Sequence, residues 1–254
     1  MIYVTGDIHG DPSRFSTRSF IEQKEMIKDD FVIICGDFGL VWRDCGEERY
    51  WLNWLNDKPF TTLFVDGNHE NFDRLYNEFE EVEFHGGLAH RIRNSIYHLE
   101  RGHIFNLCGK SFFAFGGARS HDIKDGILDP VHFPTSDEFK KEYSKWRSQG
   151  KKFRVKGFSW WPQELPSKSE MDFGIENLSL HSNSVDFVIT HCLPQSIAAL
   201  YSHGCYRPDA LTMYFNDLLS RGLKFADWYC GHYHTNCDIT ADYHIIYEKI
   251  RRIV

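Results

Sequence analysis

The chain has 254 residues, of which 42% are hydrophobic and 26% are charged, close to the average of folded globular proteins. This composition excludes a disordered chain or a fibrous repeat, and the length fits one domain with an insertion. The formal net charge of -7 argues against a protein that coats extended nucleic acid, although it leaves room for a locally bound anion.

Compartment and membrane contact are indicated by the cysteines and by the start of the chain. There are seven cysteines, an odd number, and none stands in a Cys-x-x-Cys pair, which favours a reduced protein. The first strand-like run begins at Ile2, so we expect no signal peptide ahead of it. No apolar stretch approaches the roughly 18 residues of a membrane-spanning helix. We therefore expect a cytoplasmic protein without a membrane partner, and the oligomeric state stays open.

Short apolar runs rich in β-branched and aromatic residues predict five buried strands, at residues 2–5, 31–35, 61–65, 185–190 and 224–230. Between the first three lie two segments with helical spacing, residues 12–28 and 47–57. This alternation is typical of βαβ units, so it predicts a central and largely parallel sheet.

The rest of the chain has a different pattern. Residues 89–115 alternate over short runs, which predicts antiparallel strands joined by tight turns. Residues 118–184 contain four prolines and two expected helices, near 136–148 and 168–180, and we interpret this range as an insertion or cap over the site. Residues 238–247 favour a closing hairpin. We expect a single α/β domain with mixed β-sheets flanked by helices.

Polar clusters follow the five predicted strands directly. They are Asp7-Ile8-His9, Gly36-Asp37, Gly67-Asn68-His69-Glu70, Thr190-His191 and Gly231-His232-Tyr233-His234. A lone Asp or His after a strand is more often a turn residue or a helix cap than a ligand. Five clusters that all offer carboxylate, carboxamide or imidazole groups are hard to explain as turns. Because ligands bind beyond the carboxyl ends of the strands of an open α/β sheet, we expect the clusters to converge.

In this order the clusters resemble the calcineurin-like metallophosphoesterases, whose pattern runs Asp-x-His, Gly-Asp, Gly-Asn-His-Asp/Glu, His and Gly-His-x-His. The resemblance spans residues 7–234 and implies a fold with its metal site at the carboxyl ends of the strands. It also implies two metal ions. Asp7, His9 and His234 would hold one ion, Asn68, His191 and His232 would hold the other, and Asp37 would bridge them.

The chemistry of these side chains is consistent with that implied role. A carboxylate has two oxygens and can join two cations, which suits Asp37. Mixed nitrogen and oxygen ligands suit manganese, iron or zinc, and the sequence does not choose among the three. Two divalent ions against two carboxylates leave a net positive site that attracts a phosphate ester, and ions about 3.5–4 Å apart can activate a bridging hydroxide.

The resemblance also assigns His69 as the acid that protonates the leaving group. Many relatives support this histidine with a second Asp in Gly-Asp-x-x-Asp, but Leu40 occupies that position here. Asp44, Asp66 and Glu70 are the candidate replacements, and the sequence does not place any of them against His69.

Substrate contacts are predicted less directly. The protein phosphatases of the family use two arginines that this chain lacks, which leaves Arg43, Arg74 and Arg119 as candidates, with a surface or structural role as the alternative for each. Residues 116–122 could place Arg119 and His121 over the metals, or form an ordinary glycine turn. The basic stretch 140–156, with its interleaved aromatic residues, is either a phosphate-binding patch or a solvated helix face.

These observations lead to three functional hypotheses. The first is a hydrolase with two metal ions that acts on a phosphodiester or nucleotide through a metal-bridging hydroxide. The alternative is a phosphomonoesterase such as a serine/threonine protein phosphatase, which the missing arginines disfavour. The third is a non-catalytic binding scaffold, which the intact ligand set and His69 disfavour. The expected partner is a small phosphate ester or a nucleotide.

Overall fold

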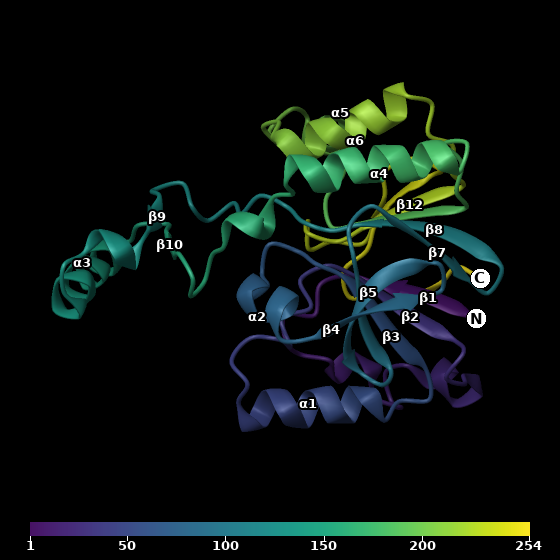
Figure 1. Ribbon diagram of the computed structural model, residues 1–254, viewed down its shortest axis with the longest axis horizontal. Helices are drawn as coiled ribbons and strands as arrows, with labels where there is room; N and C mark the ends of the chain where they lie inside the picture. The colour runs from purple at the N-terminus through teal and green to yellow at the C-terminus, as the bar shows by residue number, and fades with distance from the viewer.

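The computed structural model describes residues 1–254 and has four layers, in which two β-sheets pack face to face and helices cover both outer faces (Figure 1). This confirms the expected α/β fold with mixed sheets flanked by helices. The five predicted strands are all present, but they divide between two sheets instead of forming one. None of the helices combines the length and the apolar character needed to span a bilayer.

The first sheet has seven strands in the order β15-β1-β2-β3-β6-β5-β4. Strands β1, β2, β3 and β6 run parallel, and the others pair antiparallel with their neighbours. The first three are buried on both faces, which explains their continuous apolar runs. The bounds are β1 (Ile2–Thr5), β2 (Phe31–Cys35), β3 (Thr61–Val65), β4 (Glu80–Phe84), β5 (Gly87–Arg93), β6 (Ile96–Leu99) and β15 (Arg251–Arg252).

The second sheet has six strands in the order β13-β14-β12-β11-β8-β7. The expected antiparallel pairs and the closing hairpin are confirmed, but the chain passes from the first sheet to the second between β6 and β7. The two sheets enclose a shared apolar core. The bounds are β7 (His103–Leu107), β8 (Lys110–Phe115), β11 (Phe187–Thr190), β12 (Asp227–Cys230), β13 (Cys237–Asp238) and β14 (Tyr243–Ile245).

Helices α1 (Gly46–Asn56) and α2 (Phe72–Asn77) cover the outer face of the first sheet. The expected helix at 47–57 is therefore confirmed. The one expected at 12–28 is wrong, because only two short 3-10 turns form there, η1 (Ser13–Phe15) and η2 (Ile21–Glu25). Between them the Ser16 hydroxyl accepts a hydrogen bond from the Ser19 backbone N–H at 3.3 Å, a local bond that competes with a helix.

The outer face of the second sheet is covered by α4 (Lys168–Leu180), α5 (Gln195–Ser202) and α6 (Ala210–Ser220). Helix α4 matches the helix expected near 168–180. However, it packs Leu178, with Met171 and Ile175, into the core of the body. Its range therefore belongs to the body and does not form part of a cap.

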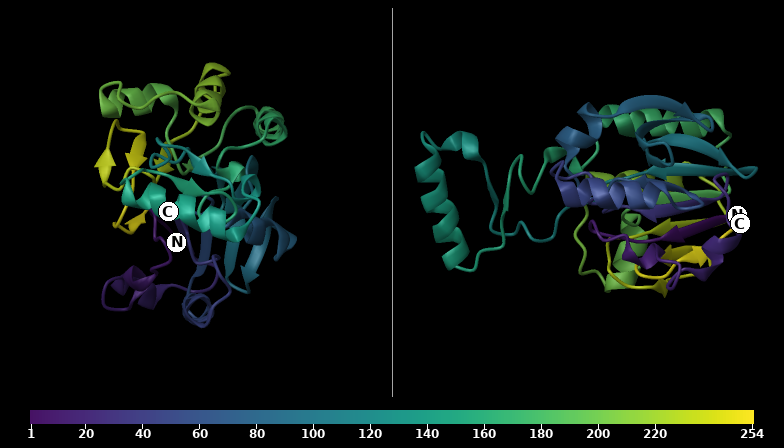
Figure 2. Two further views of the ribbon diagram at one scale, coloured as in Figure 1. Left: turned by 90° about the vertical axis from the view of Figure 1, so that its left-hand side faces the viewer. Right: turned by 90° about the horizontal axis from the view of Figure 1, so that it is seen from below.

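The part of the 118–184 range that leaves the body is an arm, defined here as residues 121–161 (Figure 2). It contains β9 (Ile127–Leu128), η3 (Pro130–His132), α3 (Ser136–Ser148) and β10 (Arg154–Val155), and η4 (Pro162–Glu164) follows it. Helix α3, at the position expected for 136–148, has no buried residue and projects away from the body. We expected this range to lie over the site, but only the base of the arm reaches it.

Candidate metal centre

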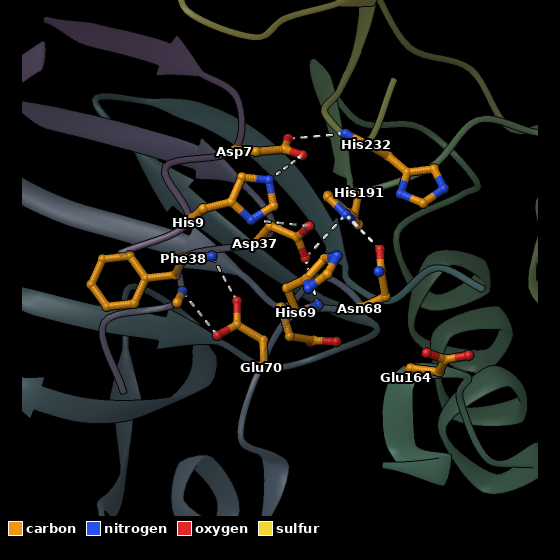
Figure 3. A network of polar contacts seen from close by, with 12 residues as sticks. Asp7, His9, Asp37, Phe38, Asn68, His69, Glu70, Glu164, His191 and His232 are labelled. Carbon is orange, nitrogen blue, oxygen red and sulfur yellow. Dashed lines mark hydrogen bonds and ion pairs between the residues drawn. The ribbon is translucent and has the colours of Figure 1, made fainter. Parts of the chain in front are cut away.

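Five loops meet at the carboxyl ends of β1, β2, β3, β11 and β12, and they carry all seven expected ligands. Figure 3 labels these ligands except His234. The first three loops leave the first sheet and the other two leave the second, so the site lies across the junction of the two sheets. Each loop follows a fully or largely buried strand. The rigid strand ends therefore fix where the polar side chains lie.

One group of ligand atoms is formed by Asp7, His9 and His234. The two Nε2 atoms of His9 and His234 lie 3.0 Å apart, and His234 Nε2 lies 3.1 Å from Asp7 Oδ2. The Asp7 side chain has no exposed surface, whereas those of His9 and His234 are 34% and 51% exposed. This side of the site is therefore open to solvent.

A second group lies deeper and contains Asp37, His191 and Asn68. Nε2 of His191 is 3.3 Å from both Asp37 Oδ1 and Asn68 Oδ1. The amide of Asn68 donates to Ser120 Oγ at 3.3 Å, and Ser120 Oγ donates to Glu164 at 2.5 Å, which turns the amide oxygen toward His191. This chain of hydrogen bonds holds Asn68 in the orientation that a ligand needs.

The tautomer of His191 is fixed by its backbone partner. Its Nδ1 lies 2.7 Å from the Cys35 carbonyl oxygen and donates to it, which leaves Nε2 as the ring nitrogen that faces Asp37 and Asn68. His232 lies beside it, with ring centroids 4.9 Å apart, and its backbone N–H donates to Asp7 Oδ1 at 2.9 Å. Burial lowers the pKa of His232 well below its usual range and keeps its ring neutral.

The site fits cations on its own chemistry. Asp7 Oδ2 is buried, and although His234 Nε2 lies 3.1 Å away, no hydrogen bond of good geometry reaches this oxygen, which is costly for a charged group. Burial opposes protonation of His191, but the carboxylates of Asp37 and Asp7 outweigh it and raise the pKa of this ring to about 10. The two buried carboxylates thus attract positive charge strongly, and the nitrogen and oxygen donors suit a transition metal ion.

Several ligands are held in unusual backbone conformations. His9, Asp37, His232 and His234 all have positive φ, between 46° and 68°, a region that residues with side chains rarely occupy. Four such residues in one site indicate strain that the surrounding structure compensates. Gly67 adds a close approach, because a Cβ atom at this position would lie 2.0 Å from Asp37 Oδ1.

His69 lies at the edge of the ligand cluster, with its ring centroid 5.1 Å from that of His9. Its backbone N–H donates to Asp37 Oδ1 at 2.7 Å. Both terminal nitrogens of Arg154 face the ring, at 3.0 Å from Nδ1 and 2.9 Å from Nε2. A neutral imidazole has one acceptor nitrogen, so only one of these contacts is a hydrogen bond. Burial, with a smaller contribution from Arg154, lowers the pKa of His69 to about 4.

None of the three carboxylates considered as replacements for the second Asp contacts His69. Asp44 is exposed and pairs with Arg49 at 2.8 Å. Asp66 is buried against Arg101 and His98. Glu70 accepts hydrogen bonds from the backbone of Phe38 and Gly39, at 2.7 and 3.2 Å.

Each of these carboxylates is satisfied elsewhere, and Leu40 itself is buried in the apolar core. The contact to His69 instead comes from Arg154 at the base of the arm. Its Nε donates to Asp122 at 2.6 Å, and one terminal nitrogen donates to the Ser159 carbonyl at 2.9 Å. Sequence reasoning missed Arg154, because nothing distinguished it within the basic stretch 140–156.

The other arginine candidates lie in different surroundings. Arg74 pairs with Glu48 and Glu78, both within 2.8 Å, and is structural. Arg43 is exposed and lies over the Phe158 ring, outside the ligand cluster. Arg119 and His121 line a cavity that also borders His232, and the His121 ring is 4.5 Å from that of His232. The structure therefore brings this last pair to the site.

A second bracing arginine was also not expected. Arg14 donates to the Asp7 carbonyl oxygen at 2.7 Å and to Thr5 Oγ1 at 2.9 Å, and it contacts the carbonyl of Tyr247. It ties the loop after β1 to the C-terminal part of the chain. Arg14 is the second residue of η1. Nothing in the sequence around it distinguishes it as a residue that braces the site.

Comparison with known proteins identifies the class. A family model described as calcineurin-like phosphoesterase matches residues 1–236. The chain therefore belongs to the calcineurin-like phosphoesterase family, whose members are metal-dependent hydrolases of phosphoric esters.

Two curated relatives share part of the sequence. The chain is 27% identical to a lariat debranching enzyme of Danio rerio and 28% identical to lariat debranching enzyme A of Xenopus laevis, in each case over 145 residues. These matches take in 50% of this chain but only 24% and 26% of the relatives. The chain thus matches about a quarter of the length of either relative.

Proposed function

We propose that the chain hydrolyses a phosphodiester or a nucleotide at a site that holds two divalent metal ions. The observation that carries this proposal is the placement of two buried carboxylates between the histidines. Asp7 belongs to the group with His9 and His234 and also to a group with Asp37 and His191. Asp37 Oδ1 lies 3.3 Å from His191 Nε2, and its Oδ2 lies 3.8 Å from Nδ1 of His9, so the Asp37 carboxylate lies between rings of the two groups. The family and the similarity to lariat debranching enzymes support a phosphoesterase.

In this proposal Asp7, His9 and His234 hold one ion, and Asn68, His191 and His232 hold the other. Asp37 is shared between the two. Two such ions, when bound, supply a water of lowered pKa and neutralise the phosphoryl oxygens. Manganese, iron and zinc all suit the donor set, and metal analysis distinguishes them.

The remaining chemistry is assigned to His69 and Arg154. His69 is neutral in the free protein, so in this proposal it takes up a proton when the negatively charged substrate binds and then gives that proton to the departing oxygen. At the same time Arg154 moves from the imidazole to a non-bridging oxygen of the substrate. The guanidinium is suited to this because Asp122 and the Ser159 carbonyl hold it from behind. A fixed arginine beside the ligands is also the observation that favours the alternative, a phosphomonoesterase such as a serine/threonine protein phosphatase.

Metal stoichiometry tests the site. We expect two ions per chain by elemental analysis after reconstitution, and we expect Asp37→Asn to reduce both. A wild-type value that saturates at one, with Asp37→Asn unchanged, would contradict the two-ion site. Comparing kcat/KM for p-nitrophenyl phosphate with that for bis(p-nitrophenyl) phosphate separates the two substrate classes. A preference for the monoester would favour the alternative.

A series of leaving groups tests His69. General acid catalysis contributes about 10²- to 10⁴-fold, and more for basic leaving groups. We therefore expect His69→Ala to lower kcat for alkyl esters far more than for p-nitrophenyl esters, with the metal content unchanged. Equal losses across the series, or loss of metal, would mean that His69 positions the site and does not donate the proton.

A further inference from the structure

A cavity of about 820 Å³ opens beside the metal centre, where it borders His232. It lies between the segment after β8, which carries Arg119 and His121, and the loop between α5 and α6, which carries Tyr206 and Arg207. The His121 ring lies between the rings of His232 and Tyr206, at 4.5 and 5.3 Å. A substrate bound at the metals therefore has room to extend into this cavity.

The charge of the lining is uneven. Three cations, Arg119, Lys124 and Arg207, line the cavity, and none of them forms an ion pair or a side-chain hydrogen bond. The only acid in the lining is Asp209, whose Oδ1 already accepts hydrogen bonds from the backbone of Leu211 and Thr212 at 2.9 Å. The lining thus has uncompensated positive charge in a chain of net charge -7.

Gln195 provides a second, independent observation. It lines the same cavity, and its Nε2 donates to the Tyr206 carbonyl at 3.0 Å. This bond fixes the amide, yet Gln195 Oε1 is buried and has no hydrogen-bond partner. A buried acceptor of this kind is normally satisfied, so a hydroxyl group of a molecule bound in the cavity is a suitable donor for it.

From these observations we infer that the cavity binds a second phosphate group of the substrate, together with the hydroxylated group that carries it. The inference rests on the proposed function and narrows its substrate class to nucleotides with a phosphate in addition to the one that is cleaved. Unpaired arginine and lysine side chains bind phosphate oxygens by charge-assisted hydrogen bonds. The aromatic side chains His121 and Tyr206 offer apolar surface to the nucleoside.

Two substrates with the same leaving group test the inference. They are the p-nitrophenyl esters of thymidine 5′-phosphate with a free 3′-hydroxyl and with a 3′-phosphate. Because the bond cleaved is the same, a difference reports the second phosphate. We expect the 3′-phosphate to lower KM by about tenfold or more, since hydrogen bonds between charged groups are stronger than neutral ones. Equal KM values for the two esters would overturn the inference.

Two variants with the same change in charge test whether the effect of the 3′-phosphate on KM arises in the cavity. The test variant is Arg119→Gln/Lys124→Gln/Arg207→Gln, and the control is Lys140→Gln/Lys141→Gln/Arg147→Gln on the exposed face of α3. We expect only the test variant to lose the advantage of the 3′-phosphate. If the control variant loses it equally, the effect comes from the overall charge and the inference is wrong.

A binding measurement without metal completes the test. In EDTA, calorimetry with inorganic pyrophosphate should detect binding to the wild type and to the α3 variant, and about tenfold weaker binding to the cavity variant. Equal binding to all three would overturn the inference. Failure of the proposed function is recognised separately, because wild type would then hydrolyse neither thymidine ester nor bis(p-nitrophenyl) phosphate. Hydrolysis of all three without a preference would contradict only the inference.

Discussion

Replacing Arg154 is the most informative single change, because it separates the contribution of the arm from that of the metal ligands. The Arg154 side chain is 11% exposed, and its partners are Asp122, Ser159 and His69. None of these is a proposed metal ligand. Arg154→Met keeps much of the apolar stem and removes the guanidinium. We therefore expect the metal content to stay unchanged.

The size of the effect follows from the bond that is lost. A hydrogen bond from a charged donor contributes about 1.5–3 kcal/mol, which corresponds to roughly 10- to 150-fold in kcat/KM. Arg154→Lys keeps the charge without the planar fork and should fall between wild type and Arg154→Met. Asp122→Asn should cost less than Arg154→Met, because Asp122 is 52% exposed and only orients the guanidinium.

Lys156→Gln is the matched control. Lys156 lies two residues further along, pairs with Asp129 at 2.7 Å and does not contact His69. The assay is steady-state hydrolysis of bis(p-nitrophenyl) phosphate, with metal content and thermal unfolding measured on the same samples. If Arg154→Met retains activity within about twofold of wild type, or if Lys156→Gln loses as much, the guanidinium does not act on the substrate.

Three further predictions concern stability and metal binding. Arg101→Met should lower the free energy of unfolding by about 3–5 kcal/mol in urea titrations, because it leaves the fully buried Asp66 carboxylate with His98 alone and without the guanidinium; a loss below 1 kcal/mol would contradict this. Gly67→Ala should reduce metal content, since its Cβ would lie 2.0 Å from Asp37 Oδ1, whereas Gly46→Ala, which meets no atom within 4 Å, should not. Burial, reinforced by Glu81, raises the pKa of Glu100 to about 7 from its ordinary 4.5, so its contribution to stability is present below pH 4.5 and is lost as the pH rises through about 7. Glu100→Gln should therefore stabilise the protein more at pH 8 than at pH 5, by at most about 3 kcal/mol, and equal effects at both pH values would refute the assignment.

Much of the centre of the fold could be predicted because the strands that carry the ligands are continuous apolar runs. Such runs indicate burial on both faces whichever sheet the strand joins. The sequence could not show that β1 to β3 lie in one sheet and β11 and β12 in another, because pairing depends on contacts between distant segments. The spacing also favoured a helix at residues 12–28, which does not form because local hydrogen bonds such as the one at Ser16 compete with it.

The ligand set could be predicted for a different reason. Metal ions bind only a few residue types, so the candidate ligands can be recognised by their side chains. Each of them follows directly after a predicted strand, and the end of that strand determines where the ligand lies. Arg154 could not be predicted in this way. It reaches His69 from 85 residues away in the sequence, and no local pattern distinguishes it from the solvated lysines around it. The roles of the ligands and of His69 stay predictions until metal and kinetic measurements are made.

The exposed position of α3 also bears on the motions of the protein. An isolated helix of 13 residues is marginally stable in water, and α3 is supported mainly by aromatic contacts within the arm, such as Trp146 with Phe153 at 5.1 Å. Amide protons of the arm should therefore exchange with solvent through local opening, whereas those of β1 to β3 should exchange only when the whole protein unfolds. Arg154 lies at the base of the arm, so we expect local opening of the arm to move the guanidinium away from His69.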